Sequence, residues 1–121
     1  MSSGIIIIDT NSLIYAIRNR VDIRSQLLSF PEISSIMIPQ CVLNELSGLS
    51  SRIPEASGAL KMAANFEHVD SEGSGDECVL NAAIARKAAI LTNDRELRDR
   101  ARAKGIRTFS IRGKNRIDVS L

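Results

Sequence analysis

Four acidic side chains occupy positions from which a folded chain could bring them together. Two of them directly follow apolar stretches typical of buried strands, a third begins a helix after a glycine-rich segment, and the fourth lies inside a helix at the border of its apolar stripe. In that order they are Asp9, Asp94, Asp76 and Glu45. Each aspartate could also serve only as a helix N-cap, worth about 1 kcal/mol, and Glu45 could be an ordinary surface residue.

Carboxylates that meet at one edge of a sheet need a positive partner. At ~5 Å and an effective dielectric constant of ~20, two of them repel by ~3 kcal/mol. No Lys or Arg lies within two positions of Asp9, Glu45 or Asp76, and Asp94 has only Arg95 beside it. We therefore expect a hard divalent cation with oxygen ligands, Mg²⁺ or Mn²⁺. A single His and two cysteines at apolar positions argue against zinc.

The elements that must position these acids alternate as strands and helices. We expect strands at 5–8, 35–38, 66–69, 88–92 and 106–111, and helices at 12–18, 21–28, 39–49, 54–65, 76–86 and 94–104. The run Ile5–Ile8 lacks the alternation of a half-exposed strand, so both of its faces should be buried. The order predicts one domain over residues 1–121, a three-layer α/β/α fold with a central, mainly parallel sheet. Such sheets place their sites at the carboxyl ends of the strands.

The two cysteines predict free thiols. Cys41 and Cys78 both fall at apolar helical positions, and secreted domains of this size carry more cysteines than two. We therefore expect two buried thiols in a reducing compartment. No signal peptide or membrane-spanning stretch is visible, which predicts a cytoplasmic protein without a membrane partner.

Charge is distributed unevenly along the chain. Residues 1–85 carry 5 basic and 10 acidic side chains, a balance of −5, whereas residues 86–121 carry 11 basic and 4 acidic ones, a balance of +7. The basic segment from Arg86 to Arg116 indicates either a polyanionic partner or a solvated helix face. Aromatic residues are scarce, which argues against a base-stacking platform for RNA.

The acids and their neighbours resemble the motifs of a known nuclease family. Four segments are similar, in the same order, to the acidic motifs of the PIN domain: Asp9-Thr10-Asn11, 39–46, Gly75-Asp76-Glu77 and 92–97. Within that family, the helix that begins Asn-Asp-Arg-Glu-Leu and the tail 111–116 look closer to the archaeal and eukaryotic branch involved in ribosomal RNA processing than to VapC-type toxins.

The resemblance implies a ribonuclease that hydrolyses RNA phosphodiester bonds with Mg²⁺ or Mn²⁺. The catalytic and metal-binding residues would be Asp9, Glu45, Asp76 and Asp94. A metal ion can lower the pKa of bound water toward ~7, so no histidine base is needed. Thr10, Asn11 and Thr92 would orient the carboxylates or cap helices, and Glu77 would join or replace Asp76 if its helix began one residue later. The basic residues expected to follow the RNA backbone are Arg95, Arg98, Arg112, Lys114 and Arg116.

Other interpretations compete with this one. A receiver domain of two-component signalling has a similar length and an acidic pocket, but it needs paired acids after the first strand and an aspartate after a central strand. Here Asp9 stands alone and Pro39 follows the second strand. A non-catalytic member of the PIN family that binds RNA or supports assembly also fits. For partners beyond RNA, a homodimer, a ribosome-assembly factor and an antitoxin are open alternatives.

Overall fold

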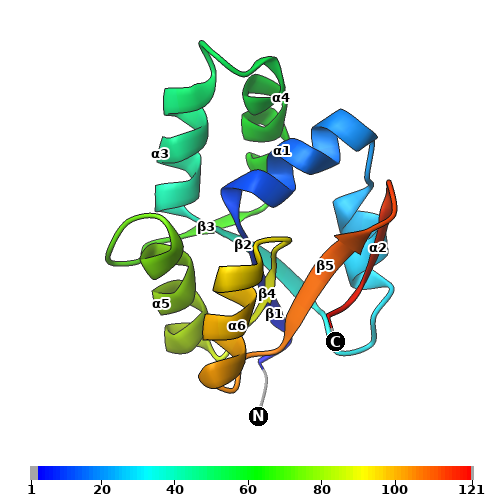
Figure 1. The fold of residues 1–121 in the computed structure, drawn as a ribbon, viewed down its shortest axis with the longest axis vertical. Helices are drawn as coiled ribbons and strands as arrows, with labels where there is room; N and C mark the ends of the chain where they lie inside the picture. The colour runs from blue at the N-terminus through cyan, green and yellow to red at the C-terminus, as the bar shows by residue number, and fades with distance from the viewer. Residues whose placement is uncertain (1–2, 121) are drawn as a thin grey trace.

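The computed structural model describes residues 3–120, which form a six-stranded sheet with helices on both sides (Figure 1). The strands are β1 (Ile5–Ile8), β2 (Ser35–Pro39), β3 (Glu67–Val69), β4 (Ala89–Leu91), β5 (Thr108–Arg112) and β6 (Arg116–Val119). The helices are α1 (Thr10–Asn19), α2 (Ile23–Leu28), α3 (Gln40–Leu49), α4 (Pro54–Ala63), α5 (Asp76–Arg86) and α6 (Arg95–Ala103). None of the helices in this range is long and apolar enough to cross a lipid bilayer.

The strand order is β3-β2-β1-β4-β5-β6, and every neighbouring pair is parallel except β5 with β6. The connections from β1 to β3 step across the sheet in one direction, and those from β3 to β5 step in the other. Right-handed crossovers therefore place the connecting helices on opposite faces. The three-layer α/β/α fold and its mainly parallel sheet confirm the prediction.

Strand β1 lies between β2 and β4 in the middle of the sheet. Its residues Ile6, Ile7 and Ile8 have no exposed surface, as the unbroken apolar run predicted. Register pairs Ile8 with Leu91 of β4 and Ile7 with Met37 of β2, so the ends of these strands meet at one edge. This buried strand is the rigid base on which the first acid stands.

The most important difference from the predicted elements lies at the end of the chain. The segment 111–116 was predicted to be a basic tail, but it forms a hairpin whose second strand, β6, pairs antiparallel with β5. The backbone of Gly113 has φ +59° in the turn, a conformation that residues other than glycine rarely adopt. Ile117 is buried in the new strand, whereas Arg116 is exposed. Ile117 and Val119 alternate with charged residues, but two apolar residues give too short a periodic signal to predict a strand with the segment before it.

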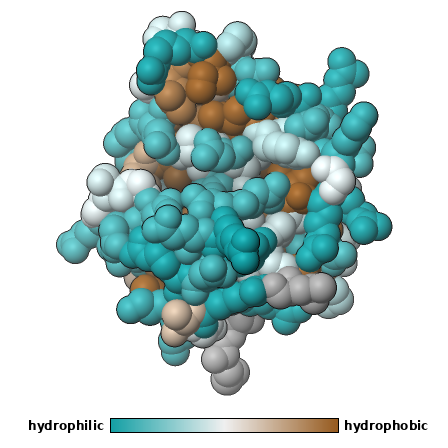
Figure 2. Space-filling view, viewed as in Figure 1, coloured by the Kyte–Doolittle hydropathy of each residue, from teal (hydrophilic) through white to brown (hydrophobic). Residues whose placement is uncertain are grey.

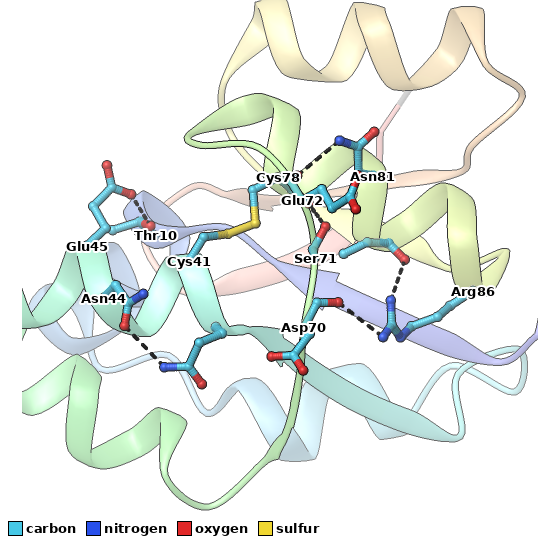
Figure 3. Close-up of a disulfide and its surroundings, with 12 residues drawn as sticks. Thr10, Cys41, Asn44, Glu45, Asp70, Ser71, Glu72, Cys78, Asn81 and Arg86 are labelled. Carbon is cyan, nitrogen blue, oxygen red and sulfur yellow. Dashed lines mark hydrogen bonds between the residues drawn. A yellow bond between two sulfur atoms is a disulfide. The ribbon is translucent and has the colours of Figure 1, made fainter.

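The prediction of two free thiols was wrong, because Cys41 and Cys78 form a disulfide between α3 and α5 (Figure 3). Their Cα atoms are 6.6 Å apart, within the range that a disulfide spans. Both cysteines lie on helices, as expected, but sequence spacing cannot show that two helices place their first turns side by side. The bridge joins the helix that carries Glu45 to the helix that begins at Asp76.

Removing this disulfide should lower the stability of the protein. The two cysteines are 37 residues apart, and cross-linking a loop of that length stabilises a fold by up to about 4 kcal/mol through the entropy of the unfolded chain. We expect Cys41→Ser/Cys78→Ala to reduce the free energy of unfolding, measured by urea denaturation, by about 2–4 kcal/mol. Adding a reductant should destabilise the parent protein and leave the variant unchanged. Labelling of both cysteines by a thiol probe in unreduced, unfolded protein would contradict the bridge.

Candidate active site

All four predicted acids line a single cleft of about 80 Å³ at the carboxyl edge of the sheet. They come from four different elements: Asp9 from the end of β1, Glu45 from α3, Asp76 from the start of α5 and Asp94 from the residue before α6. The remaining lining residues are Thr10, Asn11, Cys41, Val42, Gly75 and Val79. The lining contains carboxylates, other polar groups and apolar groups, but no Lys, Arg or His. The convergence expected from the strand order is therefore present.

Asp9 is the most buried of the four acids, with 7% of its surface exposed. Its Oδ1 accepts the backbone N–H of Ser12 at 2.9 Å, which caps α1, and its Oδ2 accepts the hydroxyl of Thr92. Burial raises the pKa of Asp9 above its ordinary value of 3.8, and the hydrogen bonds from Ser12 and Thr92 offset part of that rise. Asp9 therefore caps α1, and each of its carboxylate oxygens retains a lone pair that is available to a ligand.

Asp76 does not cap its helix, which separates it from the other aspartates. Gly75 is the N-cap of α5 and makes no side-chain cap bond, so Asp76 is the first helical residue. Burial raises its pKa, and the nearby carboxylates of Asp94 and Glu45 raise it further, whereas Arg100 lowers it. Asp94 and Glu45, which line the same cleft, thus both disfavour the ionised form of Asp76.

Hydrogen bonds hold the carboxylates of Asp94 and Glu45, in the first case from its own helix and in the second from α1. The Asp94 Oδ1 accepts the backbone N–H groups of Glu96 at 2.8 Å and Leu97 at 3.1 Å, so it caps α6. The hydroxyl of Thr10 donates to Glu45 Oε1, a contact drawn in Figure 3. Thr10 and Thr92 therefore each orient one acid of the cleft, as predicted for these threonines.

The donor set fits Mg²⁺ or Mn²⁺, since it consists of carboxylate and hydroxyl oxygens without a competing cation in the lining. Within residues 3–120, however, no three His, Cys, Asp or Glu side chains lie close enough together to form a ready-made site for one ion. The physical reason is visible in the contacts. Asp94 is turned toward the amides of its own helix and Glu45 toward Thr10, while the carboxylates repel one another. The acids share a cleft, but they do not form a closed ligand cluster.

Of the two remaining predicted residues, Asn11 lines the cleft and Glu77 does not. Asn11 is exposed and lines it. Glu77 does not line it and instead pairs with Arg100 of α6. The alternative in which Glu77 replaces Asp76 required α5 to begin one residue later, but the helix begins at Asp76. Asp76 is therefore the residue of this pair that faces the other acids.

The predicted basic residues lie on two elements next to the cleft. Arg95 is exposed in the first turn of α6, and Arg98 follows one turn later, with a buried Nε that makes no hydrogen bond within the described chain. Arg112, Lys114 and Arg116 are exposed at the β5–β6 turn. None of these five residues is among those that line the cleft.

Sequence reasoning missed three residues that act on this region. Ser12 holds Asp9, Arg100 supplies positive charge near Asp76, and Asn93 bonds to the backbone of Ile111 in β5. Arg100 lies six residues beyond Asp94, outside the window in which a cation was sought, although a helix brings it back toward the start of α5. Ser12 could have been found, because it stands three residues after Asp9 at the position of a capped amide.

Comparison with known proteins decides the family. The profile of the family described as "PIN like domain" matches residues 6–114, from β1 to the β5–β6 turn. The chain belongs to the PIN-like domain family. Ribonuclease VapC9 from Archaeoglobus fulgidus is a relative of this PIN-like domain. It is 32% identical in an alignment of 120 residues that covers 95% of this chain and 88% of the relative.

Solved structures agree with this assignment. The PIN domain endonuclease Utp24 superimposes with a TM-score of 0.81 at 27% identity, covering 96% of this chain and 90% of that one. VapBC2 from Rickettsia felis, solved with a DNA fragment from its promoter, matches with a TM-score of 0.65 at 20% identity, covering 88% of this chain and 98% of that one. At that identity the second match shows the shared fold alone.

The raised pKa of Asp9 predicts how stability depends on pH in metal-free protein. A carboxyl whose pKa is higher in the folded state favours folding when it is protonated, so its contribution is lost as pH rises from 3.8 through the raised pKa. We expect Asp9→Asn to remove this loss, so that its stability relative to the parent increases from about pH 4 to about pH 7 in urea denaturation with a chelator. Glu55→Gln is the control, because Arg18 lowers the pKa of Glu55 and reverses the sign. If the difference in unfolding free energy between Asp9→Asn and the parent does not vary with pH, the pKa of Asp9 is not raised by burial.

Proposed function

We propose that this PIN-like domain is a metal-dependent endoribonuclease and that the acidic cleft is its active site. The observation that carries the proposal is the gathering of Asp9, Glu45, Asp76 and Asp94 around one small cleft that no basic side chain lines. Carboxylates kept together at an energetic cost are typical of functional sites rather than of structural ones. The family supports the same conclusion, since its relatives include a protein named as a ribonuclease and one named as an endonuclease.

Mg²⁺ or Mn²⁺ held by these four acids would lower the pKa of a bound water and neutralise charge on the attacked phosphate. The chain's own contribution is to orient the carboxylates. Thr92 and Ser12 fix both oxygens of Asp9, and Thr10 fixes one oxygen of Glu45. Such contacts keep a ligand in a single rotamer, and losing them typically weakens metal binding about 10- to 100-fold. Asn11, exposed at the edge of the cleft, is placed to contact the substrate.

The substrate is proposed to be single-stranded RNA that crosses the edge of the sheet. Arg95 and Arg98 stand on α6 beside Asp94, and Arg112, Lys114 and Arg116 stand at the β5–β6 turn. Figure 2 shows hydrophilic side chains across the part of the surface formed by α5 and α6. Basic side chains outside the cleft and acids inside it fit a phosphate backbone that is bound along its length and cut at one point.

The biological setting has two proposed forms. The resemblance of the Asn-Asp-Arg-Glu-Leu helix and of segment 111–116 to the branch involved in ribosomal RNA processing favours that role, in which a ribosome-assembly factor would be the partner. The similarity to Ribonuclease VapC9 favours a toxin, in which an antitoxin would be the partner. We place the protein in the cytoplasm and propose that it can form a homodimer in either setting. Co-purification with an antitoxin-like protein would favour the second form.

Cleavage of RNA should depend on the acids and on a divalent metal. We expect the parent to cut a single-stranded RNA with Mg²⁺ or Mn²⁺ and to stop when a chelator is added. Asp9→Asn and Asp94→Asn should each lower the rate at least about 100-fold, because both remove a proposed metal ligand from the cleft. Glu67→Gln, on the edge strand β3, is the matched control and should retain activity. A metal-independent rate, or equal rates in the acid variants and the parent, would reject the assignment.

Removing charge from the β5–β6 turn should flatten the salt dependence of RNA binding. Each lost phosphate contact to a single strand lowers the slope of log K against log salt by about 0.7, so Arg112→Ala/Lys114→Ala/Arg116→Ala should lower it by up to about 2. The control variant removes the exposed charges of Arg52, Lys61 and Lys104, which lie at or beyond the last turns of α3, α4 and α6. Fluorescence anisotropy of a labelled oligonucleotide gives both slopes. An unchanged slope in the first variant would refute these contacts.

A further inference from the structure

The β5–β6 hairpin, residues 108–119, forms one edge of the sheet. The family profile ends at residue 114, inside the turn, so β6 lies outside the matched region. The turn carries three exposed basic residues, Arg112, Lys114 and Arg116, called here the basic tip. In the described part of the chain, the ion pairs are formed by Arg18, Arg100 and Arg107, so the basic tip has no acidic partner within 4.0 Å.

Three side chains from outside the hairpin bind its backbone, and we call them the tethers. The Tyr15 hydroxyl donates to the carbonyl oxygen of Gly113 at 2.9 Å. Asn93 donates to the carbonyl oxygen of Ile111 at 3.1 Å and accepts its N–H at 2.7 Å. Gln26 donates to the carbonyl oxygen of Asn115 at 2.5 Å, and its Oε1 accepts the N–H of Ile117 at 2.6 Å.

Two of the tethers, Asn93 and Tyr15, connect the hairpin to segments that carry or adjoin the acids, whereas Gln26 lies in α2. Asn93 lies between Thr92, which bonds to Asp9, and Asp94, which lines the cleft. Tyr15 lies in α1, the helix that Asp9 caps. In Figure 1, β5 and the red segment after it run beside α1 and α2. The same short segments therefore fix both the acids and the hairpin backbone.

The strand register places the basic tip beyond the cleft edge. Ile8 pairs with Leu91 and Leu91 with Phe109, so these three residues lie in one row across the sheet. At ~3.3 Å per residue, Asp9 lies about 3 Å beyond this row and Arg112 about 10 Å beyond it, while β5 lies two strand spacings, about 10 Å, from β1. A strand of RNA that enters the cleft from this side thus passes the basic tip first.

We propose that Tyr15, Asn93 and Gln26 are positioning residues that hold the β5–β6 hairpin as a preformed clamp for the RNA backbone, and so set which phosphate reaches the acidic cleft. The proposal rests on the proposed ribonuclease function. The tethers touch only hairpin backbone, and the substrate contacts belong to the basic tip. A rigid clamp binds RNA without first losing its own conformational entropy, and it fixes the distance from the tip to the cleft.

The test removes tethers without changing charge. Tyr15→Phe deletes the single hydroxyl, and Tyr15→Phe/Gln26→Ala frees the turn on two sides. Asn93 is left intact because it adjoins Asp94. The control is Ser50→Ala, which deletes a hydroxyl bonded to a backbone carbonyl oxygen at the end of α3. The readouts are KM and kcat on an end-labelled single-stranded RNA, the distribution of cleavage positions, and the affinity for an uncut RNA in the presence of a chelator.

We expect the double variant to raise KM about threefold to tenfold and to spread cleavage over neighbouring phosphates, while kcat changes less than about twofold. Tyr15→Phe should show the same pattern to a smaller degree and serves as the deciding variant if the double variant does not fold. A lower melting temperature with unchanged KM and unchanged cleavage positions would mean that the tethers are only structural, which overturns the proposal.

Failure of the ribonuclease function is distinguished by the affinity measurement. If the parent cuts no RNA but binds it, a weaker affinity in the tether variants still supports the clamp, whereas an equal affinity rejects it. If the parent does not bind RNA, both proposals fall. Binding that is equal in the parent, the tether variants and the basic-tip variant would assign the hairpin to another partner and reject the clamp.

Discussion

The burial of a carboxylate at the end of the central strand is the constraint on which the rest of the structure depends. Asp9 follows three fully buried isoleucines, so its backbone cannot move without disturbing the core. A charge in this position is costly unless hydrogen bonds or a cation compensate it. Ser12 and Thr92 supply the hydrogen bonds, and burial still raises the pKa of Asp9. A cation bound at this edge of the sheet, as proposed above, would offset the remaining cost.

The other acids meet this fixed point through less rigid elements. Glu45 and Asp94 are exposed, and Asp76 is half-buried at the first position of its helix, so their side chains are freer than that of Asp9. The Cys41–Cys78 disulfide ties the first turns of α3 and α5 together on one side of the cleft. The scaffold is thus fixed covalently and by burial, while the carboxylates retain the freedom to adjust to a ligand.

Sequence reasoning reached the fold and the place of the acids because both follow from local signals. Buried strands appear as unbroken apolar runs, and parallel strands end at a common edge, so Asp9 and Asp94 could be assigned to one site before any coordinates. The Cys41–Cys78 bridge depends on how two helices approach each other, which spacing along the chain does not encode. Ile117 is the one residue of β6 in the buried class, so this segment forms a strand mainly because it pairs with β5. Tertiary contacts alone determine these features.

The hairpin is fixed to the fold by contacts on several sides. β6 covers what would otherwise be the free edge of β5, and this pairing turns a flexible basic segment into a fixed one. The tethers also fix the orientation of the turn. Because they bond to backbone atoms, they do so whatever side chains the turn carries. Basic residues at the turn can therefore vary to suit a substrate while their distance from the acids stays constant. In the proposed ribonuclease, such a scaffold would separate the choice of RNA from the cleavage step, because the acids would cut the phosphate and the hairpin would determine which phosphate reaches them.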